Sequence, residues 1–235
     1  MKCIGFTHLN TALTRQDLAG VLAGLTLLAI IAAPVLANPR GHADRVVCAN
    51  NLRQIGIAMQ IWGNDHGDAV PHEVPVDQGG TRQHPLAVNA WLHFSWVSNE
   101  LGNARVLFCP SDEGRPARDF TGDPKGGYVH PNFANNATSY LLAHTVVGRP
   151  RDIFVADRNF GWSAVGGCSR FNLARQVDIY RWPSLGRWNA TLHNEGGNIL
   201  TFDGGVDQVN NSGLPTYLGD RPVLDNGNFH FIVPR

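Results

Sequence analysis

Side chains that could bind a metal ion or move a proton gather near the C-terminal end of the sequence. They are His193, Glu195, Asp203 and Asp207. Carboxylate oxygens suit Ca²⁺, but that ion takes about six to eight oxygen ligands, and the spacing here is not that of an EF-hand loop. The Asp203-Gly204 pair instead separates two plausible strands, 198–202 and 206–209, and glycine accepts the positive φ of a tight turn. We therefore expect a structural β-hairpin with His193 in the loop that leads into it, and a calcium site is the alternative.

Other catalytic chemistry has no recognisable signature in the sequence. It contains no Gly-x-x-x-x-Gly-Lys-Ser/Thr phosphate loop, no Gly-x-Ser-x-Gly elbow, no His-Glu-x-x-His and no Cys-x-x-Cys. The ten histidines are scattered without zinc-ligand spacing, and the formal net charge of zero gives no basic face for nucleic acid. We expect a protein that is not an enzyme, has no resident cofactor and binds no nucleic acid; a secreted enzyme with an unrecognised site is a minor alternative.

The N-terminal part of the sequence contains a long apolar segment, Leu18 to Ala37. It has no charged residue, and Thr26 is its only polar side chain. Its length matches the roughly 20 apolar residues that cross a bilayer as a helix. The positive charges of Lys2 and Arg15 favour a cytoplasmic N-terminus, so we expect a single-pass inner-membrane protein with its body outside the cytoplasm. A secretory signal cleaved after Ala37 is the alternative.

A carboxylate, Asp17, stands directly before this apolar segment, where it costs free energy unless it has a partner. The stretch 12–17 resembles the processing and assembly signal of type IV pilins and type II secretion pseudopilins. In that family a prepilin peptidase cuts after a small residue, usually Gly, and the new N-terminus is methylated. An acidic residue, usually Glu, then pairs with the N-terminal amine of a neighbouring subunit. The resemblance implies cleavage between Ala12 and Leu13, and an assembly role for Asp17; a solvated flanking charge is the alternative.

The stretch after the apolar segment predicts a helical stalk. Pro39 and Gly41 should interrupt the first helix, and apolar residues then recur at steps of three and four. These residues are Cys48, Leu52, Ile55, Met59 and Trp62. The sequence of residues 48–56 resembles the stalk of a large pilin-like family that carries a C-terminal His-x9-Asp-Gly signature. His193, Asp203 and Gly204 match that signature here.

Two of the four cysteines lie in stretches that resemble this family. Cys48 is the first residue of the stalk-like stretch 48–56, and Cys109 is the first residue of a Cys-Pro-Ser-Asp element. In a body outside the cytoplasm, the resemblance implies a Cys48–Cys109 disulfide. Pairing of Cys109 with Cys168 and a pair of free thiols are the alternatives, and Cys3 would leave with the leader peptide.

The whole sequence predicts an α+β fold, because 26 glycines and 14 prolines favour a loop-rich body. We expect a long N-terminal helix, membrane-spanning in its first half and packed on a small antiparallel β-sheet with long loops. The expected divisions are a leader at 1–12, an assembly helix at 13–37, a stalk at 38–66 and a body at 67–235. The expected function is a pilin-like or pseudopilin-like subunit of a type II secretion or type IV pilus-like filament, whose partners are prepilin peptidase, the membrane and other subunits. A membrane-anchored binding module that does not polymerise is the alternative.

Overall fold

The computed structural model describes residues 14–36, 39–144, 150–161, 177–181, 186–218 and 228–234. The chain divides into two compact units, Met1–Arg40 and Gly41–Arg235, which we describe separately. Cys3, Ala12, Leu13 and Cys168 lie outside the described residues. Cleavage between Ala12 and Leu13 therefore stays a prediction.

The helix of the first unit, α1 (Arg15–Leu36), begins at a capping box. The Thr14 hydroxyl accepts a hydrogen bond from the Asp17 amide at 3.2 Å, and Asp17 Oδ2 accepts from the Thr14 amide at 3.0 Å and the Thr14 hydroxyl at 2.7 Å. These bonds satisfy backbone amides that the first turn leaves free, and the carboxylate lies at the positive end of the helix dipole. The bonds from Thr14 also hold the pKa of Asp17 below its ordinary value.

The prediction of one long helix, membrane-spanning in its first half and packed on the sheet, is wrong. The structure has two helices, α1 and α2 (Pro39–Asn64), and proline suits the first position of a helix because its missing amide hydrogen is not needed there. Within the part of the chain that the structure describes, no helix combines the length and the apolar character needed to cross a membrane. Only α2 shares the compact unit of the sheet, apart from its first two residues.

The predicted apolar stripe of the stalk is confirmed on α2. Cys48, Leu52 and Ile55 are fully buried, Met59 is 1% exposed and Trp62 is 6% exposed. Ile57 and Ile61, on the other side of the helix, are about half exposed. The three-and-four spacing therefore places one face of α2 in the core, as expected for an amphipathic helix.

The second unit contains a six-stranded antiparallel sheet in the order β4-β8-β1-β2-β6-β7, larger than the small sheet that was expected. Its strands are β1 (Tyr140–Ala143), β2 (Ile153–Asp157), β4 (Val177–Arg181), β6 (Gly196–Thr201), β7 (Val206–Asn210) and β8 (Asn228–Ile232). A separate pair joins β3 (Phe160–Gly161) to β5 (Arg187–Trp188). The short helices are α3 (Ala90–Trp96), α4 (Ser98–Leu101), α5 (Leu214–Leu218), η1 (Val76–Gln78), η2 (Ala104–Leu107) and η3 (Ala134–Ala137).

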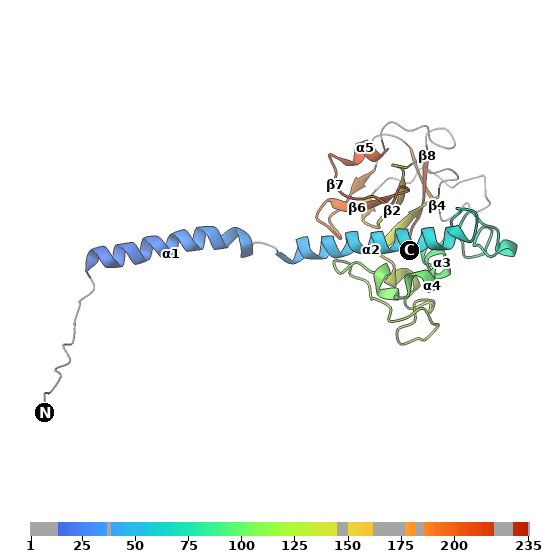
Figure 1. Ribbon diagram of the computed structural model, residues 1–235, viewed down its shortest axis with the longest axis horizontal. Coiled ribbons are helices and arrows are strands. Elements are labelled where there is room, and N and C mark those ends of the chain that lie inside the picture. Colours follow the sequence, from blue (N-terminus) through green and yellow to red (C-terminus); the bar gives the residue numbers. More distant parts are fainter. Residues whose placement is uncertain are drawn as a thin grey trace, which may run out of the picture. The chain divides into compact units, whose positions relative to one another are not determined.

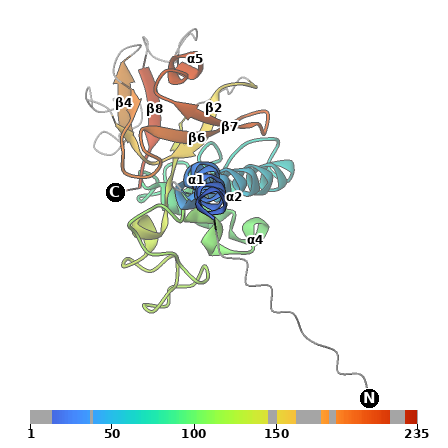
Figure 2. The same cartoon turned by 90° about the vertical axis from the view of Figure 1, so that its left-hand side faces the viewer.

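Both faces of the central strands are covered, and β1, β2 and β6 are buried along their whole length. In Figures 1 and 2, α2 runs along one side of the sheet, with α3 and α4 on the far side of α2. The row that belongs to the same core as α2 is Leu142, Val155 and Leu200. The next row along the strands belongs to a second core on the opposite face: Leu141, Ala156 and Ile199. Successive side chains of a strand point to opposite faces, and with both faces covered, consecutive residues are apolar: Leu141-Leu142, Val155-Ala156 and Ile199-Leu200.

The predicted β-hairpin is confirmed as β6 and β7, joined by a turn at Asp203-Gly204. Gly204 has a φ of 83°, which few other residues adopt without strain. Asp203 Oδ1 accepts hydrogen bonds from the Thr201 hydroxyl and, at 3.1 Å, from the Gly205 amide. The bond from Thr201 is the main cause that lowers the pKa of Asp203. Asp203 therefore builds the turn.

Candidate functional site around the disulfide

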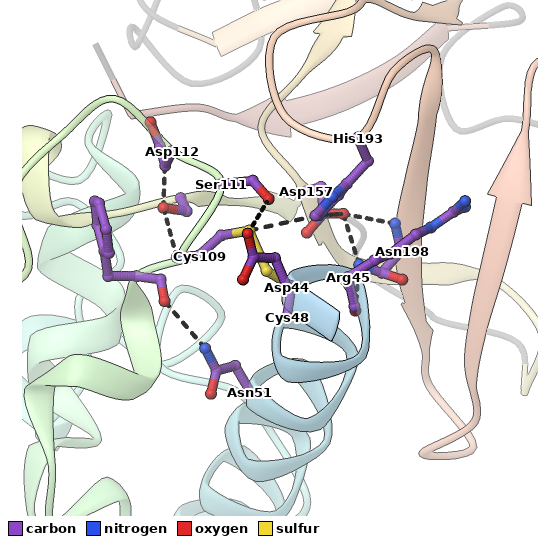
Figure 3. The surroundings of a disulfide bond; sticks show 12 residues. Asp44, Arg45, Cys48, Asn51, Cys109, Ser111, Asp112, Asp157, His193 and Asn198 are labelled. Carbon is purple, nitrogen blue, oxygen red and sulfur yellow. Dashed lines mark hydrogen bonds and ion pairs between the residues drawn. A yellow bond between two sulfur atoms is a disulfide. The ribbon is translucent and has the colours of Figure 1, made fainter. Parts of the chain in front are cut away.

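The disulfide that the resemblance implied, between Cys48 and Cys109, is present. It joins the middle of α2 to the segment after η2, with an S–S distance of 2.11 Å and a Cα–Cα distance of 5.2 Å. Both residues are fully buried. Figure 3 shows that the bond lies where α2, the 109–112 segment and the strands β2 and β6 meet. It therefore joins the stalk helix covalently to the body at an interior point.

His193 of the His-x9-Asp-Gly signature lies against this disulfide. Its Nε2 is 3.4 Å from Cys109 Sγ and 3.3 Å from Asp157 Oδ2 (Figure 3). The two residues that follow, Asn194 and Glu195, both have positive φ, at 51° and 62°. Residues other than glycine adopt this conformation at a cost, so the backbone between His193 and β6 is held by its surroundings.

Asp157, at the end of β2, is the buried acid of the site. Its Oδ2 accepts hydrogen bonds from the Asn198 amide at 2.7 Å and from Asn198 Nδ2 at 2.9 Å. Its Oδ1 is buried and has no hydrogen-bond partner among the described residues. Burial raises the pKa of Asp157 to about 7, and burial lowers the pKa of His193 to about 4, with Arg45 as a further cause. Near neutral pH His193 is therefore an uncharged imidazole.

Arg45 brings a positive charge to the same place from α2. Its Nη2 donates to the carbonyls of Gly197 at 3.1 Å and Val209 at 3.2 Å. The Arg45 carbonyl in turn accepts from Asn198 Nδ2 at 3.4 Å. One residue of α2 thus bonds to both β6 and β7. Its positive charge favours the ionised form of Asp157 and so opposes the effect of burial on the pKa of that carboxyl.

The Cys-Pro-Ser-Asp element is held on its other side by Asp112, whose side chain is 2% exposed. Asp112 Oδ2 accepts from the Ser139 hydroxyl at 2.6 Å, and Arg158 pairs with Asp112 Oδ1. The Ser139 hydroxyl accepts from the Cys109 amide at 2.9 Å. On the stalk side, Asn51 donates to the Phe108 carbonyl at 3.0 Å. The half-cystine therefore lies in a network that fixes its backbone independently of the disulfide.

The structure brings together only some of the residues that the sequence singled out. Cys48, Cys109 and His193 meet, whereas Asp203 and Gly204 lie at the opposite end of β6 from His193. Among the described residues, the donors of the alternative calcium site do not form a cluster of three or more ligand atoms. Glu195 pairs with Arg187 at 3.9 Å, and the Asp207 carboxylate accepts a hydrogen bond from the Tyr217 hydroxyl. Asp17 lies in the other compact unit.

Sequence reasoning missed the groups that complete the site. They are Arg45, Asp112, Asp157 and Asn198. Asp112 and Asn198 stand inside stretches that the sequence had already singled out. Arg45 and Asp157 carry no such signal, because only the packing of α2 on β2 and β6 places them here.

No family model, curated protein or solved structure matches this chain.

Proposed function

We propose that this chain is an exported, pilin-like structural subunit that assembles with other subunits through α1, with its body outside the cytoplasm. The observation that carries the proposal is the apolar surface of α1. Seven large apolar residues of this helix are more than half exposed: Leu18, Val21, Leu22, Leu25, Leu27, Leu28 and Ile30. Charges lie only at its start, at Arg15 and Asp17.

An apolar surface of this kind needs a cover. Burying one large aliphatic side chain is worth roughly 1.5–3 kcal/mol, and soluble surfaces seldom expose contiguous apolar patches. Neighbouring copies of α1 in a filament would supply such a cover. Gly20 and Gly24 favour close helix packing, because small residues four positions apart let two helix backbones approach. The space beside both is open, since a Cβ built at either position meets nothing within 4 Å.

The buried disulfide supports export. Disulfides persist in oxidising compartments and are rare in the cytosol. Together with the resemblance of residues 12–17 to a prepilin signal, it favours prepilin peptidase and an export machine as partners.

N-terminal sequencing of the native protein tests the proposal. We expect Leu13 at the mature N-terminus, with a methylated amine. An N-terminus at Asn38 would overturn the proposal, because α1 would then be absent from the mature protein.

The role of Asp17 gives a sharper prediction, because the structure already assigns its carboxylate to the capping box. If the carboxylate pairs with the N-terminal amine of a neighbour, Asp17→Ala should reduce crosslinking between subunits in cells by about tenfold, corresponding to about 1.4 kcal/mol. Asp17→Glu should keep the crosslinks, because the charge is retained.

Thr14→Ala is the matched control, since it removes the hydroxyl of the capping box and leaves the Asp17 charge in place. Thr14→Ala should leave the crosslinks close to wild type. Equal losses in Thr14→Ala and Asp17→Ala would reduce Asp17 to a helix cap. A mature protein that begins at Leu13 and shows no crosslinks between subunits would favour the alternative, an anchored binding module that does not polymerise.

A further inference from the structure

The disulfide site contains a set of metal-binding atoms. Cys48 Sγ, Cys109 Sγ and one ring nitrogen of His193 all lie within 4.8 Å of one another, and all three residues are buried. Among the described residues this is the only trio of Cys, His or acidic side chains with that geometry. The disulfide itself accounts for the closeness of the two sulfurs, so the case for a metal depends on the groups around them.

Asp157 supplies a fourth donor. Its Oδ2 lies 3.3 Å from His193 Nε2, and its fully buried Oδ1 has no hydrogen-bond partner in the described part of the chain. A buried carboxylate oxygen without a partner costs free energy, and native structures seldom leave one in that state. Two sulfurs, one imidazole nitrogen and one carboxylate oxygen are the donor types that tetrahedral zinc sites use.

The charges also balance. Zn²⁺ with two thiolates, a neutral imidazole and a carboxylate carries a net charge of −1. Arg45 supplies the compensating positive charge, since it interacts electrostatically with both Asp157 and His193. A site of this composition would be neutral, which a buried position requires.

We propose that the reduced form of this protein binds one Zn²⁺ through the thiolates of Cys48 and Cys109, Nε2 of His193 and a carboxylate oxygen of Asp157. Two molecules of a thiol reductant supply the two electrons that break the S–S bond, and they leave as a disulfide while the two cysteines become thiols. Zn²⁺ then replaces the two thiol protons, which pass to solvent. The bonded sulfurs must separate to roughly 3.7 Å, the spacing that Zn–S bonds of about 2.3 Å give in a tetrahedral site.

This inference does not depend on the proposed function. The disulfide and the metal would be alternative cross-links between α2 and the body at the same point. The metal would link them when the thiols are reduced, and the disulfide after oxidation. Metal binding at such a site contributes directly to folding stability.

Cobalt binding to the full-length chain in detergent tests the inference. The disulfide is reduced by a water-soluble phosphine, which takes an oxygen from water as it delivers two electrons. We expect one equivalent of Co²⁺ per chain, with thiolate-to-cobalt absorption in the near ultraviolet and tetrahedral bands in the visible, both removed by Zn²⁺. The oxidised protein should show neither absorption.

Variants distinguish a four-ligand metal site from metal binding by the two reduced cysteines alone. His193→Gln and Asp157→Asn should each weaken cobalt binding by at least about tenfold and alter the visible bands. His42→Gln, at an exposed position, and Cys168→Ala should bind like wild type. Unchanged spectra in both His193→Gln and Asp157→Asn, or no absorption from the reduced wild type, would overturn the inference.

Circular dichroism keeps the test decisive if reduction unfolds the chain. Zn²⁺ should then restore the folded spectrum of the reduced wild type but not that of reduced His193→Gln. A reduced wild type that stays unfolded with Zn²⁺ present would also overturn the inference.

Discussion

Replacing both half-cystines, Cys48→Ala with Cys109→Ala, should lower the free energy of unfolding by about 4 kcal/mol. The bond closes a loop across a sequence separation of 61 residues, and the chain-entropy model assigns about that value to a loop of this size. Urea unfolding of the full-length protein in detergent, followed by tryptophan fluorescence, measures the change. The variant should still fold, because Arg45 and Asn51 continue to bond α2 to the body.

The single variants supply the control. Each of Cys48→Ala and Cys109→Ala breaks the same bond, so each should be destabilised nearly as much as the double variant, and the effects should not add. A reductant should destabilise wild type under metal-free conditions and leave the double variant unchanged. Singles whose losses sum to that of the double variant would show that side-chain packing, and not the covalent link, carries the effect.

The features of the fold and of the site that could be predicted from the sequence are those that follow from local spacing. The stripe from Cys48 to Trp62 follows from helical periodicity, and the turn at Asp203-Gly204 follows from the conformational freedom of glycine between two strands. Asp17 also had a local explanation, since Thr14 followed three residues later by an acid is a capping pattern.

The remaining features depend on contacts between distant segments. Asp157 reaches His193 only because β2 pairs with β6, and Arg45 reaches β7 only because α2 lies along the sheet. The His-x9-Asp-Gly pattern looks like one motif in sequence, yet a six-residue strand separates His193 from the turn that Asp203 makes. His193 therefore lies against the disulfide, and Asp203 stabilises the turn of the hairpin.

Acid should destabilise the body, and His93 should be a main cause. His93 is 1% exposed, its Nε2–H donates to the Ala87 carbonyl at 2.6 Å, and its Nδ1 faces the Thr81 hydroxyl at 2.7 Å. Its pKa is lowered to about 4, chiefly by burial; the hydrogen bond to Ala87 opposes this shift, and the rings of His144 and His84 contribute to it. His72, whose ring centroid is 5.7 Å away, is likewise buried, with a pKa well below its ordinary value.

The direction of the pH effect follows from proton binding. Between pH 6.5 and 4, His93 binds a proton in the unfolded chain but not in the folded protein. The free energy of unfolding is therefore highest above pH 6.5 and decreases as the pH falls toward 4. A shift of this size corresponds to about 3 kcal/mol. Asp157 acts in the opposite direction, because its raised pKa lets the folded protein hold a proton up to about pH 7.

A comparison with His93→Gln isolates the contribution of His93 from that of Asp157. Free energies of unfolding measured from urea curves at pH 7.5, 6 and 4.5 should show wild type losing stability with acid more steeply than His93→Gln. The difference between the two proteins should therefore shrink by about 2–3 kcal/mol across this range. His42→Gln, at an exposed position on α2, should follow wild type at every pH. Parallel curves for wild type and His93→Gln would mean that the folded protein accepts the proton at His93, and that its buried ring is not kept neutral by its surroundings.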